Sequence, residues 1–216
     1  MSGRPQLPGL VNAPQTESPD APDPCNALLW VIGQNPGLNE DRANEPFIGA
    51  CGKLLRSHYL ARLDLNHNGI ACYISNAVRC YTASNASPTF PQSRACAPYL
   101  TADAHRISLA YDHRLLILAL GAVAIRTICM AVGAPNQRQS LGWWLERQGH
   151  AIRFPGAPQS WSVFTSYHPG ALLRNDRLYT QVADHMMLLR NVLTGRTPPD
   201  STPVIVEPRP FAESRS

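Results

Sequence analysis

Four short segments of the chain carry the polar and aromatic side chains that a reactive site needs. They are Gly33–Gly37 (GQNPG), Pro46–Gly49 (PFIG), Ser75–Val78 (SNAV) and Tyr167–Gly170 (YHPG). Together they supply an amide that can orient water, an aromatic face, a second amide that can read a base edge, and an imidazole. This combination suits cleavage of the bond to a nucleobase that has been flipped out of a nucleic acid.

The first segment, Gly33–Gly37, follows an apolar run and predicts a tight turn that exposes the side chains of Gln34 and Asn35. A neutral amide in such a turn can orient a water molecule without carrying a charge. The alternative is a plain strand-to-helix turn with no chemical role. A dinucleotide-binding fingerprint is excluded, because the G-x-G-x-x-G spacing is absent.

Phe47 and Asn76 are the candidate base-binding residues. Phe47 lies in a loop outside any amphipathic run, where its ring can stack on a planar base; the alternative is a ring packed into the core. Asn76 ends an apolar segment, and its amide can both donate and accept, which matches the O4 and N3–H edge of uracil. A turn-capping role is the alternative for Asn76.

His168 is held between Tyr167 and a proline, at the predicted end of another strand. Its imidazole can donate a hydrogen bond to a carbonyl oxygen that becomes negative as a base departs. Leu172 or Leu173 could then wedge into the base stack while Arg174 holds a phosphate. The alternative is that both leucines belong to the core.

Charged residues near these segments allow a modest phosphate-binding surface. The formal net charge is +4, which by itself says little about partners. Helix capping or a surface ion pair is the simpler interpretation of Glu40 and Asp41; the alternative is that one of them polarises the water or braces the loop. The basic residues close to the candidate loops could contact DNA or form an ordinary solvated surface; they are Arg42, Lys53, Arg56, Arg79, Arg94 and Arg174.

Periodicity predicts the elements that position these residues. Apolar runs predict strands at 27–32, 70–77, 115–120 and 162–167, with a further short strand at 152–154. Helical spacing of apolar residues predicts helices at 53–65, 93–111, 122–132 and 175–193, and residues 133–149 are ambiguous. Strands that alternate with helices predict an α/β fold with a largely parallel sheet covered on both faces.

Composition favours one domain at residues 25–196. Eleven of the 20 prolines lie in residues 1–24 or from residue 197 onward, which predicts disordered tails at 1–24 and 197–216. No stretch approaches the roughly 20 apolar residues of a membrane helix, and the N-terminus lacks the apolar region of a secretory signal. We therefore expect a cytoplasmic monomer with no obligatory protein partner. Cys72 and Cys129, inside apolar runs, are predicted core residues.

In order and spacing, the four segments resemble the motifs of the uracil-DNA glycosylase superfamily. The strings EPFIGACGKLL, SNAVRC and SYHPGALLRN are most similar to the bacterial family-4 type, and the resemblance extends from about Leu28 to Val192. It implies a three-layer α/β/α sandwich around a four-stranded, mostly parallel sheet. It also implies that Phe47 stacks on a flipped pyrimidine, Asn76 reads its edge, His168 stabilises charge at O2, and Leu172 is the wedge.

Two positions of the first segment depart from the family-4 pattern, which is usually Gly-Glu-Ala-Pro-Gly. Gln34 replaces the glutamate, and Asn35 matches the Gly-Ile-Asn-Pro-Gly motif of the mismatch-specific uracil/thymine branch. We therefore assign water positioning to Asn35, with Gln34 as second choice. Gly37 stands where the strict uracil enzymes carry a tyrosine that excludes C5 substituents, so a 5-modified pyrimidine could enter unless Trp143 or Trp144 fills the space.

The resemblance also raises the question of a metal. Family-4 members carry a structural iron–sulfur cluster on four cysteines, and Cys80 and Cys96 stand where two of them are expected. The N-terminal C-x-x-C pair is missing, and Cys25 alone lies near its place. No cofactor is expected for catalysis, and no catalytic metal is predicted.

The expected function is that of a monofunctional DNA glycosylase. It would hydrolyse the N-glycosidic bond of uracil or of a 5-modified pyrimidine and leave an abasic site, either in base-excision repair or in defence against modified phage DNA. A catalytically weak module that binds flipped or damaged bases is the alternative, kept open by Gln34. A third is hydrolysis of a free nucleoside or nucleotide.

Overall fold

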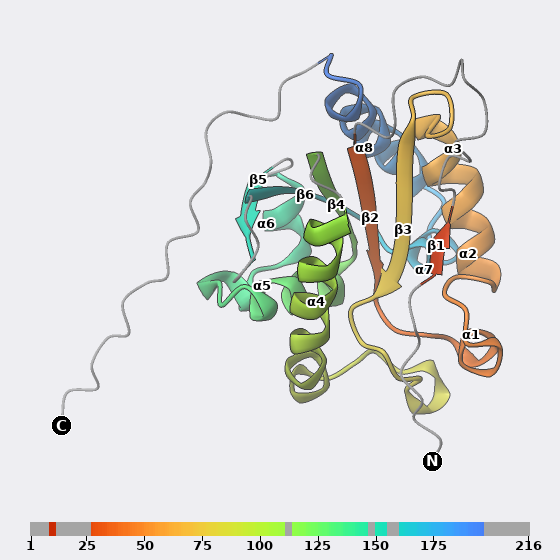
Figure 1. Ribbon diagram of the computed structural model, residues 1–216. Coiled ribbons are helices and arrows are strands. Elements are labelled where there is room, and N and C mark those ends of the chain that lie inside the picture. The colour runs from red at the N-terminus through yellow and green to blue at the C-terminus, as the bar shows by residue number, and fades with distance from the viewer. Residues whose placement is uncertain (1–8, 12–26, 111–113, 147–149, 155–159, 197–216) are drawn as a thin grey trace.

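The computed structural model describes residues 9–11, 27–110, 114–146, 150–154 and 160–196 (Figure 1). Their strands form one sheet in the order β1-β3-β2-β4-β6-β5. The central four strands are all parallel, whereas β1 and β5 pair antiparallel at the two edges. The bounds are β1 Gly9–Val11, β2 Ala27–Gly33, β3 Ile70–Asn76, β4 Arg114–Leu120, β5 His150–Arg153 and β6 Ser160–Ser166. The predicted α/β fold with a four-stranded parallel centre is confirmed.

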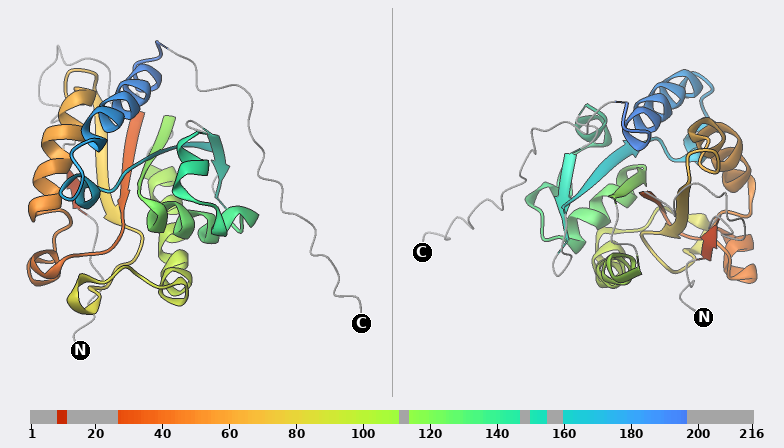
Figure 2. Two further views of the ribbon diagram at one scale, coloured as in Figure 1. Left: turned by 180° about the vertical axis from the view of Figure 1, so that it is seen from behind. Right: turned by 45° about the horizontal axis from the view of Figure 1, so that its top comes forward.

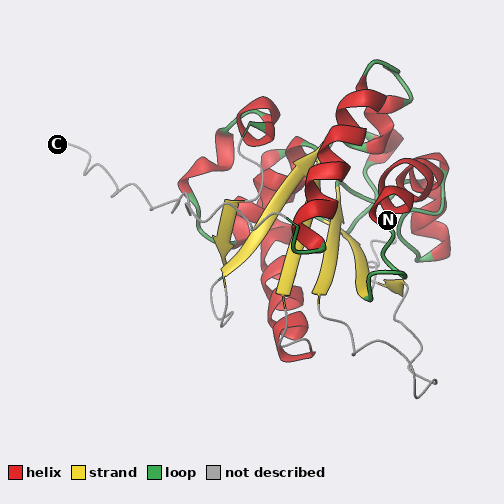
Figure 3. Cartoon of the chain, turned by 90° about the horizontal axis from the view of Figure 1, so that it is seen from above, coloured by secondary structure: helices red, strands yellow, loops and turns green. Residues whose placement is uncertain are grey.

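Helices cover both faces of the sheet, which produces three layers (Figures 2 and 3). Alternate residues of β2 belong to different cores: Trp30 packs with α4, α5 and α6, whereas Val31 packs with the α2–α3 segment and α8. Every residue of β2 and β3 is buried, as expected for strands covered on both sides. The helices of the first face are α4 Phe90–Ala110, α5 Ala122–Ala131 and α6 Leu141–Leu145.

The helices of the second face are α2, η1, α3 and α8. The helix predicted at 53–65 is in fact α2 Ala50–Leu54 continued by the π-helix η1 Leu55–Leu60 and by α3 Ala61–Leu63. The predicted closing helix is α8 Leu178–Leu193. Short helices complete the connections: α1 Leu38–Ala43, η2 Ala83–Asn85, η3 Pro135–Arg138 and α7 Pro169–Leu172.

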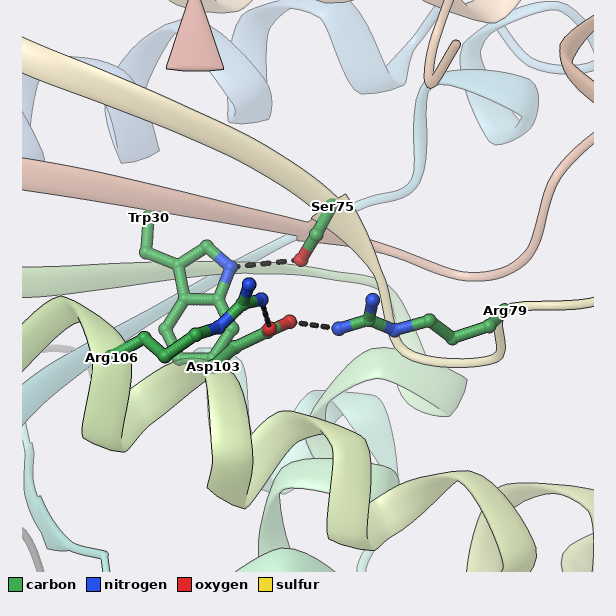
Figure 4. A network of polar contacts seen from close by, with 5 residues as sticks. All are labelled: Trp30, Ser75, Arg79, Asp103 and Arg106. Carbon is green, nitrogen blue, oxygen red and sulfur yellow. Dashed lines mark hydrogen bonds and ion pairs between the residues drawn. The ribbon is translucent and has the colours of Figure 1, made fainter. Parts of the chain in front are cut away.

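A buried polar network fixes the end of β3 against α4 (Figure 4). The indole Nε1 of Trp30 donates to Ser75 Oγ at 2.8 Å. The buried carboxylate of Asp103 on α4 accepts hydrogen bonds from Arg79, which follows β3, and from Arg106. Arg79, one of the basic residues considered for phosphate contact, is therefore a buried ion-pair partner in the fold.

Strand β1 was not predicted from the sequence. It lies inside the proline-rich segment 1–24 that was expected to be disordered. It pairs with β3 so that Gly9 stands opposite Ile74. The other residues of that segment, and residues 197–216, lie outside the described part of the chain. Cys72 and Cys129 are buried as predicted. None of the helices in the described ranges is long and apolar enough to cross a bilayer.

Candidate active site

A cleft of about 810 Å³ opens where β2 and β3 end and α7 begins. Asn35, Phe47, Asn76 and His168, which lie far apart along the chain, all line it. The carboxyl ends of parallel strands are where α/β folds place ligands. The walls are completed by other residues of the same loops: Gln34, Gly37, Leu38, Asn39, Glu40, Gly49, Ala50, Cys51, Asn85, Ser87, Gly170, Leu173 and Arg174.

Gly33 allows two of these side chains to meet at the base of the cleft. It is the last residue of β2 and stands opposite Asn76 in the parallel pairing. A Cβ atom on Gly33 would lie 2.4 Å from Phe47 Cζ and 2.5 Å from Asn76 Oδ1. The aromatic ring and the amide therefore both occupy the space that a side chain at position 33 would fill.

Phe47 is held in an unusual backbone conformation, with φ at +58°. Its carbonyl oxygen accepts a hydrogen bond of 2.5 Å from Arg56 Nη1, and Gly52 leaves room for that carbonyl. The ring is buried, 6.1 Å from the His168 ring between centroids, and lines the cleft. A strained non-glycine backbone that neighbouring groups hold in place is typical of binding sites.

His168 is the N-cap residue of α7, and its Nδ1 accepts a hydrogen bond of 3.1 Å from the backbone N–H of Gly170. An accepting Nδ1 places the proton of the neutral ring on Nε2. Burial, and then the cation of Arg174, lower the pKa of His168 to about 4. The ring is therefore neutral at pH 7 and keeps one N–H donor.

Asn35 is oriented by two hydrogen bonds from its Nδ2, to Pro36 O and to Thr82 Oγ1, both 3.1 Å long. With the NH₂ group engaged, Oδ1 is the atom available to accept a hydrogen bond from a ligand or water. The neighbouring Gln34 has a different environment, because its Nε2 makes a contact of 3.4 Å with Ser87 Oγ. Asn35 is thus the better-anchored amide of the pair.

Glu40 is a buried carboxylate of the cleft wall, and the sequence allowed several roles for it. Its Oε1 accepts a 2.8 Å hydrogen bond from the backbone N–H of Gly49. Its Oε2 lies 2.5 Å from the point that a Cβ on Gly37 would occupy. Glu40 therefore braces the two loops.

The tryptophans considered as fillers of the space beside Gly37 lie elsewhere. Trp144 is buried in the core on the opposite face of the sheet, and Trp143 packs against that core.

The assignment of Leu172 as the wedge is wrong. Leu172 is only 3% exposed and packs in the core between the sheet and α8, because α7 turns it inward. Leu173, the next residue, is 57% exposed and lines the cleft together with Arg174. Lys53 is exposed on α2 but is not among the residues of the cleft wall.

Comparisons with known proteins identify the family of the chain. A family model described as the uracil DNA glycosylase superfamily matches residues 19–188. The chain belongs to this superfamily. It is 30% identical to the type-4 uracil-DNA glycosylase of Pyrobaculum aerophilum over 150 residues, which cover 69% of this chain and 70% of that protein. It is 27% identical to the type-4 uracil-DNA glycosylase of Saccharolobus solfataricus over 177 residues, 79% of this chain and 73% of that protein.

A third relative shows a similar degree of identity. The type-4 uracil-DNA glycosylase of Thermotoga maritima is 29% identical over 151 residues, which cover 68% of this chain and 67% of that protein. All three relatives are named type-4 uracil-DNA glycosylases. The predicted membership of the superfamily is confirmed.

The cysteines of this superfamily member do not fit a four-thiolate iron–sulfur cluster. Cys96 is buried, and it lies close enough to the exposed Cys80 to raise the pKa of that thiol further than burial alone. Within the described ranges, no group of three or more His, Cys, Asp or Glu side chains could hold a metal. Cys25 lies outside those ranges and could supply only a third ligand, whereas a cluster usually needs four.

The two leucines that follow His168 give a direct test of which one meets DNA. Leu172→Ala should lower the free energy of unfolding by about 2–5 kcal/mol, because it leaves a cavity in the core. Leu173→Ala should leave the melting temperature unchanged and slow base excision from duplex DNA, since an exposed apolar wedge offsets the cost of unstacking.

Thermal unfolding and single-turnover excision, measured on duplex and on single-stranded oligonucleotides, separate the two effects. Single-stranded DNA has no base pair to open and no duplex for a wedge to enter, so Leu173→Ala should excise from it at the unmodified protein's rate. An equal loss on both substrates would contradict the wedge assignment to Leu173.

Proposed function

We propose that the chain is a monofunctional DNA glycosylase that removes uracil from DNA and leaves an abasic site. The observation that carries the proposal is the convergence of Asn35, Phe47, Asn76 and His168 on one cleft. The names of the relatives, type-4 uracil-DNA glycosylases, support the same activity.

The flipped pyrimidine lies against the ring of Phe47, with the amide of Asn76 on its O4 and N3–H edge. Base–aromatic stacking is typically worth about 1–3 kcal/mol. The Nε2–H of His168 donates to O2 of the base, where negative charge grows as the bond between C1′ and N1 breaks and its electron pair goes to the base. A donor aimed at this oxygen stabilises the transition state more than the ground state.

Water completes the reaction at C1′, which becomes oxocarbenium-like as the base departs. Asn35 accepts a hydrogen bond from this water through Oδ1, and this bond directs the oxygen of the water at C1′. An amide is not a base at neutral pH, so the water loses its proton only as the new C–O bond forms, and that proton passes to solvent, from which the departing base anion takes up one in turn. None of the described residues that line the cleft is a lysine. A Schiff base is therefore not expected, and neither is cleavage of the DNA strand by the enzyme.

DNA is the proposed partner, held by its phosphates. Arg174 lines the cleft beside His168, and Leu173 stands next to it as the exposed apolar side chain. Lys53, on the exposed side of α2, can reach phosphate further from the reacting nucleotide. Binding through such contacts weakens as salt rises.

The proposed substrate range includes 5-modified pyrimidines. Gly37 offers no side chain to exclude a C5 substituent, and neither tryptophan of α6 lines the cleft. The carboxylate of Glu40 lies next to Gly37 and favours a substituent that donates a hydrogen bond. Excision of such bases would serve defence against modified phage DNA, whereas a strict preference for uracil would serve base-excision repair.

The test uses oligonucleotides that contain one uracil or one 5-hydroxymethylated pyrimidine, followed by alkali. Cleavage at the base position after alkali, and none before it, supports a monofunctional glycosylase. Comparison of the two substrates assigns the base. Intact DNA on every substrate would refute the enzyme and favour the module that only binds flipped bases.

We expect Asn35→Ala to lower single-turnover excision by roughly 10- to 100-fold, because the water is no longer aimed at C1′. Binding of uracil-containing DNA should change little, since Asn35 does not hold the base. Gln34→Ala is the matched control, and it should excise within a few fold of the unmodified protein. Tight binding with the same product level in Asn35→Ala would instead support the binding module.

A further inference from the structure

Three arginines gather around one aromatic ring beside the cleft. The guanidinium carbons of Arg94, Arg126 and Arg138 lie 5.2, 5.9 and 5.9 Å from the centroid of the Phe90 ring. Arg94 and Arg138 are exposed and Arg126 is half-buried. Each distance lies within the range of a cation–π contact. The three residues come from α4, α5 and η3, so the fold itself brings them together.

No carboxylate offsets this charge in the described part of the chain. Within that part, the ion pairs involve Arg79, Arg106 and Arg190, and none of the three arginines around Phe90. Arg126 is partly removed from water, and this burial lowers the pKa of its guanidinium group. Three like charges held together in this way repel one another, and an anion placed among them would relieve that repulsion.

The cluster adjoins the cleft through one loop. Asn85 and Ser87 line the cleft, and Phe90 begins α4 three residues later. Arg126 Nη2 donates to Pro88 O at 3.0 Å and to Ser93 Oγ at 3.1 Å, so it fixes the loop from behind. Neither Arg94 nor Arg138 is among the described residues that line the cleft, so both lie outside the site of the reacting base.

A groove continues the basic surface along α4. It measures about 790 Å³ and is lined by Arg94, His105 and Arg106 together with apolar and neutral residues of α4, α5 and η3. Among the described residues that line it, none carries a carboxylate. The nearby Asp103 is buried between Arg79 and Arg106, and this group of three keeps a net positive charge.

We propose that Arg94 and Arg138, gathered on Phe90 with Arg126 behind them, form a second phosphate-binding surface for the DNA strand outside the cleft. The identity of this ligand rests on the proposed function. The strand whose nucleotide enters the cleft passes Arg174 on one side and crosses the loop at Ser87 to the arginine cluster on the other. These contacts carry charge and no base edge, so the surface binds DNA without reading its sequence.

The experiment compares the double variant Arg94→Gln/Arg138→Gln with the unmodified protein in fluorescence anisotropy. The probe is a labelled duplex, with and without one uracil, titrated at several salt concentrations. Loss of two phosphate contacts should reduce the slope of log K against log salt by about 2 on both duplexes. Excision by saturating enzyme should keep its rate, because the cleft is unchanged.

The matched control is Arg62→Gln/Arg196→Gln, which removes the same charge from exposed positions on α3 and just beyond α8. Its salt slope should equal that of the unmodified protein. The proposal of this surface would be overturned if all three proteins had the same slope of log K against log salt, or if both double variants reduced that slope equally. Product formation in the same preparations is scored separately, so an inactive protein that still shows the slope difference refutes only the glycosylase proposal.

Discussion

Gly33→Ala should abolish most base excision while the protein still folds and binds DNA. The new methyl group would lie 2.4 Å from Phe47 Cζ and 2.5 Å from Asn76 Oδ1. Non-bonded carbon–carbon and carbon–oxygen contacts are not so short, so the ring and the amide must both move away. A displacement of about 1 Å in a reacting site can cost roughly 100-fold in rate, and here it affects stacking and base reading together.

Single-turnover excision of uracil from a duplex measures this loss, and anisotropy with a uracil-free duplex measures DNA binding. Gly142→Ala is the matched control, because a Cβ there would meet only Ser140 Oγ at 3.8 Å. We expect the control to excise normally. Overpacking at Gly33 should also cost about 1–3 kcal/mol of stability, which thermal unfolding reports. Excision at the normal rate in Gly33→Ala would show that the base neither stacks on Phe47 nor is read by Asn76.

The central sheet could be predicted because its strands are covered on both faces. Continuous apolar runs such as Ala27–Ile32 distinguish such strands from loops without any knowledge of their neighbours. Strand β1 could not be predicted, since three residues in a proline-rich segment give no periodicity and its pairing with β3 spans more than sixty positions. The π-helical turn at Leu55–Leu60 likewise leaves no sequence pattern that differs from an α-helix.

The convergence of the candidate residues on one cleft could also be predicted, because Asn35, Asn76 and His168 lie at or next to the ends of apolar strands. The direction of each side chain could not. Leu172 and Leu173 are identical in type, and only the packing of α7 against α8 decides which one is buried. Glu40 received no single role, since its partner Gly49 donates through the backbone. The cluster around Phe90 joins Arg94 to Arg138 across three elements, and no local pattern contains it.

His168→Asn should lower excision by about 100- to 1,000-fold, the usual effect of removing one donor to a developing oxyanion. Asparagine is a good N-cap residue, and its Oδ1 can accept the Gly170 N–H in place of Nδ1. The start of α7 is therefore preserved, while the N–H that reaches into the cleft is lost. The rate of a saturated single turnover measures the loss, and unchanged binding of uracil-containing DNA is the control.

The pH dependence gives an independent test of the same residue. Because the pKa of His168 is lowered to about 4, the neutral ring persists well below pH 6.5. Protonation would turn Nδ1 from an acceptor into a donor facing the Gly170 N–H, so excision should stay level between pH 8 and about 5 and fall around pH 4.

Stability should depend on pH through the same residue, because the unfolded chain binds this proton near pH 6.5. The stability that the neutral ring contributes is therefore complete above pH 6.5 and is lost as the pH falls towards 4. His168→Asn should lack this loss of stability, and a fall in excision centred near pH 6.5 would mean that His168 is exposed to water and does not face the base.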